Sequence, residues 1–256
     1  MIGRQCLVAC GFIVFFVFGC SDGVKSSTQK TKEVVKQINV SQVLTEVKDS
    51  QKAEQLFLQG NHLFDGQRYQ DAIAVYDQAI AIKPESADIW INRGNALASL
   101  QKYKDALSSY DQAIALQPQK DEAWYNRGNV LITLQNYQGA VAAYDKAIAL
   151  EANKAAAWIN RGIALTKMQR YQEALKSYER AIALNPEKPE AYYNQACTYA
   201  LQGNLGLTIT NLKKAIQLAP DKYQQLAKVD PDFAKVRNNQ QFQELIQEKK
   251  ELEERG

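Results

Sequence analysis

Hydrophobic and polar residues follow one another along this chain in a pattern that repeats every 34 residues from Ala53 onward. Each unit holds two apolar stripes of helical period, separated by a short polar break such as QKY, QNY or QRY. Small residues occupy positions 8, 20 and 27 of most units, and large residues occupy positions 4 and 24. The pattern predicts five pairs of closely packed helices. The pairs must stack, because one pair cannot bury its apolar faces alone.

Several positions keep one residue type through the units, which begin at Ala53, Ala87, Asp121, Ala155 and Pro189. The recurring residues include the tryptophans Trp90, Trp124 and Trp158, the glycines Gly60, Gly94, Gly128 and Gly162, and the alanines Ala79, Ala113, Ala147, Ala181 and Ala215. Proline at position 32 of most units ends the second helix, because it cannot continue the helical hydrogen bonds. Over residues 53–222 the pattern resembles the tetratricopeptide repeat family.

The resemblance implies an all-α fold, a right-handed superhelical solenoid of five helix-turn-helix units whose first helices line a concave groove. Past Pro220 the period fades, but the chain still has a helical pattern. Apolar residues there are expected to cover the last unit: Tyr223, Leu226 and Val229, followed by Phe233, Val236, Phe242, Leu245 and Ile246. We therefore predict the repeat solenoid over residues 51–222 and C-terminal capping helices over 223–256.

The first twenty residues, MIGRQCLVACGFIVFFVFGC, differ from the rest, because Arg4 is their only charge and an uncharged, mostly apolar run follows from Cys6 to Phe18. This run is too short to span a bilayer comfortably, which takes about 20 apolar residues, and it is typical of a secretory signal peptide. The sequence VFGC resembles the lipobox of bacterial lipoproteins. The resemblance implies a signal over residues 1–19, acylation of Cys20 with fatty acids such as palmitate, and a bacterial source.

The polar residues 20–50 then form a flexible tether behind the lipid. We expect an exported protein held on a membrane, and Ser21 slightly favours the outer membrane over the inner or plasma membrane. An uncleaved N-terminal anchor and plain secretion are the alternatives to lipidation.

An arginine stands at position 7 of the three central units, and an aspartate precedes each by sixteen residues. At 100° per residue, position 7 points toward the neighbouring unit. A charge placed there needs a partner of opposite sign. We therefore predict inter-repeat salt bridges between Arg93 and Asp77, Arg127 and Asp111, and Arg161 and Asp145. The alternative is that the arginines bind a phosphate or carboxylate of a ligand.

Asparagines recur at positions 6 and 9, which the same helical geometry places toward the groove, beside position 5. An asparagine amide carries both a donor and an acceptor, and so matches a peptide unit. The predicted peptide-binding groove consists of Asn92, Asn95, Asn126, Asn129, Asn160, Asn194, Tyr125 and Tyr193. The alternative is that asparagine is simply common at these positions in the family.

Composition argues against catalysis, because His62 is the only histidine and Cys197 is the only cysteine beyond the first twenty residues. The glycines recur at a packing position, so we expect no phosphate-binding loop. A net charge of +3 without a long basic run disfavours nucleic acid. We expect no enzyme, cofactor, metal or small-molecule substrate, and a protein partner together with a membrane.

The function predicted is therefore a membrane-tethered scaffold or adaptor in the assembly of an envelope complex. Two alternatives remain open. One is an anchored assembly factor for a photosynthetic or other membrane complex, and the other is a non-catalytic regulatory subunit of a separate enzyme.

Overall fold

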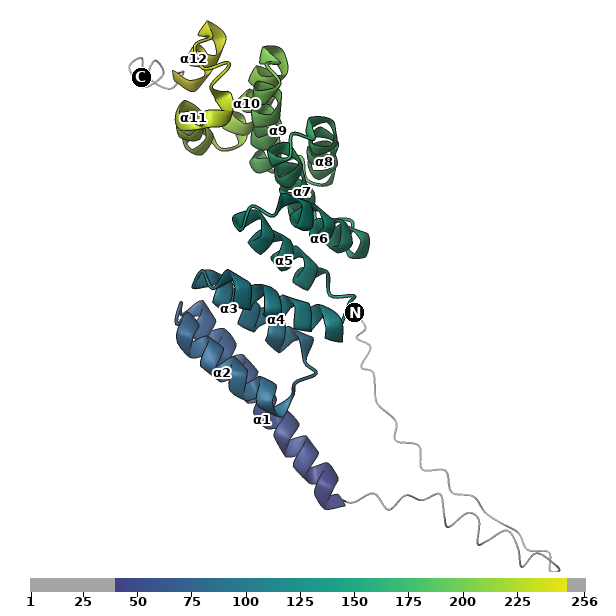
Figure 1. Ribbon diagram of the computed structural model, residues 1–256. Helices are drawn as coiled ribbons and strands as arrows, with labels where there is room; N and C mark the ends of the chain where they lie inside the picture. The colour runs from purple at the N-terminus through teal and green to yellow at the C-terminus, as the bar shows by residue number, and fades with distance from the viewer. Residues whose placement is uncertain (1–39, 248–256) are drawn as a thin grey trace, which may run out of the picture. The chain divides into compact units, whose positions relative to one another are not determined.

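A computed structural model describes residues 40–247, and every regular element in that range is helical. The helices of the repeats are α1 (Val40–Asp65), α2 (Tyr69–Ile82), α3 (Ala87–Ser99), α4 (Tyr103–Leu116), α5 (Asp121–Thr133), α6 (Tyr137–Leu150), α7 (Ala155–Lys167), α8 (Tyr171–Leu184), α9 (Pro189–Leu201) and α10 (Leu205–Leu218). They are followed by α11 (Pro220–Val229), the 3₁₀ helix η1 (Pro231–Phe233) and α12 (Gln240–Gln247). The predicted fold class, an all-helical solenoid of consecutive helix pairs, is confirmed (Figure 1).

Neighbouring units contact one another mainly through the second helix of one unit and the first helix of the next. Contacts between units join each even-numbered helix to the next odd-numbered one, and they also join α3 to α5, α5 to α7 and α7 to α9. The odd-numbered helices therefore lie closer to one another than the even-numbered helices do. This places them on the inner side of the stack, which we call the groove.

The recurring glycines provide space for a buried tyrosine ring. A Cβ atom on Gly128 would lie 2.6 Å from Cε1 of Tyr144, and the same arrangement recurs at Gly60, Gly94 and Gly162. The ring of Tyr144 is fully buried. Glycine at position 8 thus allows the two helices of a unit to approach closely around the tyrosine at position 24.

The recurring tryptophans join the first helix of a unit to the loop that precedes it. The indole N–H of Trp90 donates to the main-chain oxygen of Pro84 at 2.9 Å. Trp124 and Trp158 repeat this bond to the oxygens of Pro118 and Ala152, each at 3.0 Å. A half-buried indole N–H needs an acceptor, and position 32 supplies one through its carbonyl group.

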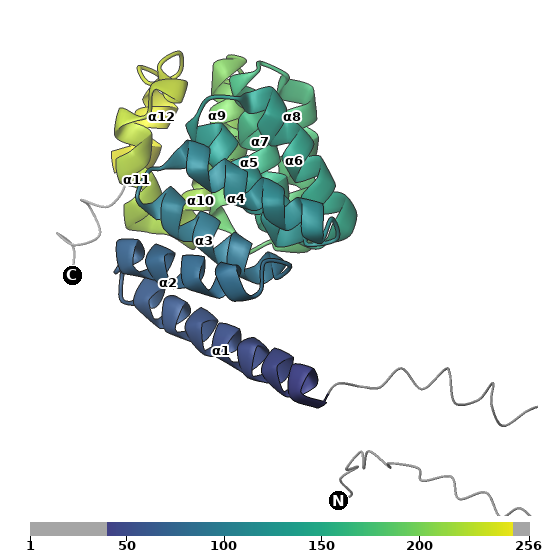
Figure 2. The same ribbon diagram turned by 60° about the horizontal axis from the view of Figure 1, so that its bottom comes forward.

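The last unit packs against the C-terminal elements. Figures 1 and 2 show α11 and α12 beside α9 and α10, and α9 also contacts η1. Tyr223, Phe233, Val236, Phe242, Leu245 and Ile246 are buried in this cap, as the apolar pattern predicts. Leu226 and Val229 are an exception, because they remain 41% and 73% exposed. The prediction that these two residues cover the last unit is therefore wrong.

The boundary of the tether also differs from the prediction. Residues 40–50 lie in α1, which runs without a break into the first unit, so the flexible segment predicted over 20–50 does not reach residue 50. The solenoid unit itself begins at Val47. The signal peptide, Cys20, residues 20–39 and residues 248–256 lie outside the described residues. Within residues 40–247, none of the helices has the length and apolar character needed to cross a bilayer.

Candidate functional site

Arginine and aspartate side chains pair across the junctions between units. Arg93 Nε lies 2.6 Å from Asp77 Oδ1, Arg127 Nε lies 2.7 Å from Asp111 Oδ1, and Arg161 Nε lies 2.6 Å from Asp145 Oδ1. These are the three inter-repeat salt bridges that the sequence predicts. Two of the arginines also donate from Nη1 to a serine of their own unit, Arg93 to Ser109 at 2.8 Å and Arg161 to Ser177 at 2.7 Å. The guanidinium groups thus bind protein acceptors at the joints of the solenoid.

The groove asparagines form hydrogen bonds to one another from unit to unit. Nδ2 of Asn92 donates to Oδ1 of Asn61 at 2.8 Å, Asn126 donates to Asn95 at 3.0 Å, and Asn160 donates to Asn129 at 2.9 Å. Each acceptor also receives a tyrosine hydroxyl of its own unit at 2.8 Å, from Tyr76, Tyr110 and Tyr144 respectively. We call these asparagines and tyrosines the amide ladder.

The amide ladder fixes the orientation of each asparagine. Because Asn95 Oδ1 accepts two hydrogen bonds, its Nδ2 group is turned the other way and has no protein partner among residues 40–247. In the same part of the chain Asn126 Oδ1 has no donor, since Asn126 is bound through Nδ2. Both side chains are half-buried. Each step of the ladder therefore presents one donor group and one acceptor group to a ligand.

Burial keeps the ladder tyrosines protonated. It raises the pKa of Tyr76 to about 12, and the nearby Asp65 carboxylate acts in the same direction. Burial likewise raises the pKa of Tyr110 and of Tyr144. At neutral pH these hydroxyls are donors, which agrees with their bonds to asparagine oxygens.

The ladder ends at the fourth unit, where Ile163 replaces the asparagine at position 9. Asn194 has no amide acceptor there, and its Nδ2 donates to the main-chain oxygen of Glu190 at 2.7 Å. The hydroxyl of Tyr178 instead lies 3.2 Å from Thr166 Oγ1. The amide repeat thus stops one unit before the end of the solenoid.

The two predicted groove tyrosines have different environments. Tyr125 is half-buried beside the ladder, where its hydroxyl accepts a bond from Asn160 Nδ2 at 3.3 Å. Tyr193 is only 7% exposed, and its hydroxyl donates to Asp230 Oδ2 at 2.8 Å. The prediction of Tyr193 as a groove contact is wrong, because the C-terminal segment covers its ring through Tyr223 and Phe233.

A pocket lies at each end of the ladder. The first has a volume of about 320 Å³ and is lined by Asn61, Phe64, Asp65, Tyr76, Asn92 and Asn95. The second has a volume of about 440 Å³ and lies between the last two units and the segment around η1. Its lining includes Ile163, Lys167, Cys197, Leu226, Val229, Asp230 and Asp232.

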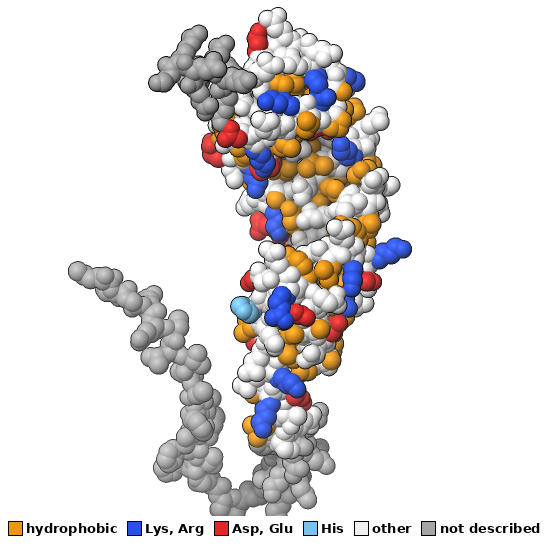
Figure 3. All heavy atoms as spheres, turned by 90° about the vertical axis from the view of Figure 1, so that its left-hand side faces the viewer, with side chains coloured by type: hydrophobic (Ala, Val, Ile, Leu, Met, Phe, Trp, Pro, Cys, Tyr) orange, Lys and Arg blue, Asp and Glu red, His pale blue; other side chains and the backbone are white. Residues whose placement is uncertain are grey.

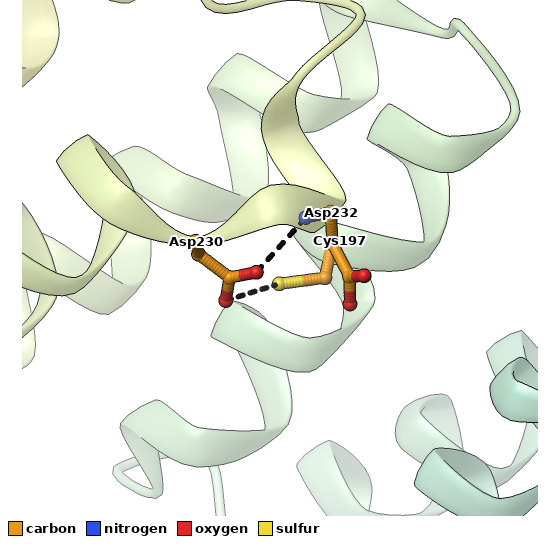
Figure 4. A group of neighbouring side chains, drawn as sticks. All are labelled: Cys197, Asp230 and Asp232. Carbon is orange, nitrogen blue, oxygen red and sulfur yellow. Dashed lines mark hydrogen bonds between the residues drawn. The ribbon is translucent and has the colours of Figure 1, made fainter.

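Cys197, Asp230 and Asp232 lie close together (Figure 4), and all three line the second pocket. Their donor atoms lie within 4.8 Å of one another. Asp230 Oδ1 accepts the backbone N–H of Asp232 at 3.0 Å, and Oδ2 lies 3.8 Å from Cys197 Sγ. Burial raises the pKa of the Cys197 thiol, and the two carboxylates raise it further. A protonated thiol is not a nucleophile, and the contact between Cys197 and Asp230 links α9 to the residue before η1.

Side chains of both charges share one face of the molecule. Figure 3 shows Lys and Arg side chains interspersed with Asp and Glu over one face. His62, the single histidine, is exposed on α1.

The sequence matches models of a known repeat family. Tetratricopeptide repeat models match residues 49–87, 57–120, 91–157, 155–188 and 177–209. A search of curated protein sequences gives no match.

Solved structures give the same fold. YrrB, described as a TPR protein with an unusual peptide-binding site, is 25% identical with a TM-score of 0.59, over 72% of this chain and 93% of that chain. PilW, a type IV pilus biogenesis factor, is 24% identical with a TM-score of 0.66, over 75% and 90%. MamA from Desulfovibrio magneticus RS-1 is 18% identical with a TM-score of 0.62, over 65% and 94%.

Proposed function

Because this chain belongs to the tetratricopeptide repeat family, we propose that it is a non-catalytic scaffold that holds an extended segment of a partner protein in its groove. The observation that carries the proposal is the amide ladder. Asn61, Asn95 and Asn129 present unpaired Nδ2 groups within the described chain, and Asn92, Asn126 and Asn160 present unpaired Oδ1 atoms. A polypeptide backbone offers the complementary acceptors and donors.

The spacing of the ladder also suits an extended chain. Packed helices lie about 8–10 Å apart, and three extended residues span about 10 Å at roughly 3.3 Å each. One step of the ladder therefore corresponds to about three residues of an extended partner. Recognition through the backbone depends little on partner sequence. The description of YrrB as a peptide-binding protein supports a peptide as the class of ligand.

The experiment that tests this proposal is affinity capture from detergent-solubilised native membranes, followed by mass spectrometry. The test variant carries Asn92→Ala, Asn126→Ala and Asn160→Ala. Each change removes one donor, yet the buried tyrosine hydroxyls keep their acceptors. The matched control carries Gln78→Ala, Gln112→Ala and Gln138→Ala, which remove three exposed amides from even-numbered helices.

The proposal expects a partner that the wild type and the glutamine control retain and the asparagine variant loses. A partner that all three proteins retain equally would place the interface outside the groove and overturn the proposal. Circular dichroism of the purified variants establishes that each one is folded.

We further propose that the scaffold is exported and attached to a membrane through acylated Cys20, in the service of envelope-complex assembly. The support comes from residues 1–20, in which a positive charge at Arg4 is followed by an apolar run and then by Cys20. Several acyl chains hold a protein on a bilayer stably, whereas one chain gives only marginal binding. Intact mass of the native protein tests this proposal. A chain that begins at an acylated Cys20 is expected, and retained Met1 would replace the lipid with an uncleaved anchor.

A further inference from the structure

The second pocket lies where the amide ladder stops. Asn194 and Cys197 of α9 line it from the groove side, at the positions that carry ladder asparagines in earlier units. Leu226, Val229 and Asp230 line it from the C-terminal segment. An extended segment that follows the ladder toward the fifth unit therefore reaches this pocket.

Both sides of the pocket contribute apolar side chains to its lining, beside polar ones. Ile163 of α7 takes the place of a ladder asparagine at position 9, so Asn194 is the one amide among the residues that line the pocket. Leu226 and Val229 of α11 face the same space and are 41% and 73% exposed. Exposed apolar side chains that gather at one concave site mark a place where a ligand can bury them. The apolar side chains thus add a site for a side chain where the ladder of backbone-binding amides stops.

The charged side chains that line the pocket carry an excess of negative charge. Its lining contains the carboxylates of Asp230 and Asp232 and one ammonium group, that of Lys167. Lys167 Nζ lies 3.4 Å from Asp232 Oδ2 and is 45% exposed, so this pair is loose. Arg237 bonds to the main-chain oxygen of Asp230 and not to its carboxylate.

Asp230 therefore has no cation as a partner among residues 40–247. Its carboxylate receives neutral donors only, namely the hydroxyl of Tyr193, the thiol of Cys197 and the backbone N–H of Asp232. A half-buried carboxylate with a second carboxylate beside it favours the arrival of a positive charge.

We propose that this pocket receives a lysine or arginine side chain of the partner segment held by the groove. The methylene stem packs on Ile163, Leu226 and Val229, as long basic side chains do along apolar surfaces. The cationic head binds the carboxylates of Asp230 and Asp232, and Lys167 moves aside into solvent. The inference rests on the proposed function, because the amide ladder delivers the segment to the pocket. The pocket would thus give a preference for lysine or arginine to a groove that otherwise binds main-chain groups of the partner.

The test uses fluorescent peptides of one composition, rich in serine and alanine, that differ at a single central residue. That residue is arginine, norleucine or glutamate, and binding is measured by fluorescence anisotropy. Norleucine retains the aliphatic stem and lacks the charge. We expect the arginine peptide to bind about fivefold to tenfold more tightly than the norleucine peptide, and the glutamate peptide to bind most weakly.

Two variants locate the effect. Asp232→Asn is expected to reduce the affinity of the arginine peptide to the norleucine level and to leave the norleucine peptide unchanged. Its matched control, Asp105→Asn, removes an exposed acid from α4 and is expected to change neither affinity. Val229→Lys places an ammonium group at a 73% exposed site in the pocket and is expected to weaken the arginine peptide selectively.

Each other outcome overturns the proposal. If the wild type binds the three peptides equally and the Asn92, Asn126 and Asn160 triple variant binds none of them, groove binding is supported and the pocket proposal is wrong. If no peptide binds, both the proposed peptide-binding function and the pocket proposal are wrong. Zn²⁺ titration by calorimetry covers the remaining case. Stoichiometric Zn²⁺ binding that Cys197→Ser abolishes would assign the pocket to a metal ion instead.

Discussion

The hydrogen bonds of the amide ladder predict how much each asparagine contributes to the free energy of unfolding. Asn95→Ala removes the acceptor of the Tyr110 hydroxyl, a bond of 2.8 Å on a side chain that is 1% exposed. A buried hydroxyl left without a partner costs about 1–3 kcal/mol. The second bond that Asn95 accepts, from Asn126, is half-buried, and water can replace it. We therefore expect Asn95→Ala to lower the free energy of unfolding by about 2 kcal/mol.

Asn126→Ala removes only the donor of that second bond, so Asn95 still accepts the tyrosine hydroxyl. Its expected cost is about 0.5–1 kcal/mol, the typical net value of one hydrogen bond. Urea denaturation followed by circular dichroism measures both variants. In a domain of this size, 1 kcal/mol corresponds to a shift of about 2–4 °C in Tm.

A third variant isolates the buried hydroxyl. Tyr110→Phe in the Asn95→Ala background removes the orphaned group, so the double variant should be about 1 kcal/mol more stable than the sum of the two single losses. The reasoning is refuted if the two single losses simply add, or if Asn126→Ala costs as much as Asn95→Ala. The same asymmetry is why the groove experiment changes asparagines at position 6 and leaves those at position 9.

Three further predictions concern packing, the junctions between units and alkaline pH. Gly128→Ala forces a methyl group into a tyrosine ring, and overpacking of about 1–3 kcal/mol outweighs a helix-propensity gain of about 1 kcal/mol. A Cβ atom at Gly206 meets nothing within 4 Å, so Gly206→Ala should instead raise Tm, and scanning calorimetry of both variants measures the two effects. Ala143→Ser should raise stability by about 1 kcal/mol, because the hydroxyl would accept from Arg127 as serines do in two other units; a lower Tm would contradict this. Since folding raises the pKa of Tyr76 from 10.0 to about 12, its contribution is complete below pH 10 and is lost as pH rises through 12. The loss is about 1.4 kcal/mol per pH unit, and Tyr76→Phe should make the measured decline shallower.

The sequence predicts the solenoid well because one period fixes every unit. Small residues recur opposite large ones at a constant spacing, so helix pairing needs no long-range information. Arginine at position 7 was informative for a similar reason. A charge at an apolar junction requires a nearby opposite charge. An aspartate precedes each of these arginines by sixteen residues, at Asp77, Asp111 and Asp145.

The amide ladder was harder to predict. Helical geometry placed Asn92 and Asn95 on the groove side, but it could not show that Asn92 bonds to Asn61. The pattern predicts only a large residue at position 24, where Tyr76 stands, and does not show that the Tyr76 hydroxyl bonds to Asn61. A pattern of hydrophobicity describes the ring of a tyrosine and not its polar tip. The repeated spacing of asparagine and tyrosine, fifteen residues in three units, was the available signal.

The C-terminal end of the groove could not be predicted from the period at all. The apolar pattern after Pro220 predicts a cover for the last unit, but because this segment does not repeat, the pattern does not show that the cover lies over Tyr193. The apolar residues of α11 were also misread, because Leu226 and Val229 line a pocket instead of covering the last unit. The pocket is a product of tertiary packing between α9 and a non-repeating segment.

The most direct test of the groove is photo-crosslinking in native membranes. A photoreactive amino acid replaces Asn126 on an odd-numbered helix in one protein and the exposed Gln112 on an even-numbered helix in another. After illumination, mass spectrometry identifies the attached peptides. We predict that the protein modified at position 126 forms a covalent adduct with an extended segment of a partner, and that the protein modified at position 112 does not. Adducts formed at position 112 and absent at position 126 would contradict groove binding.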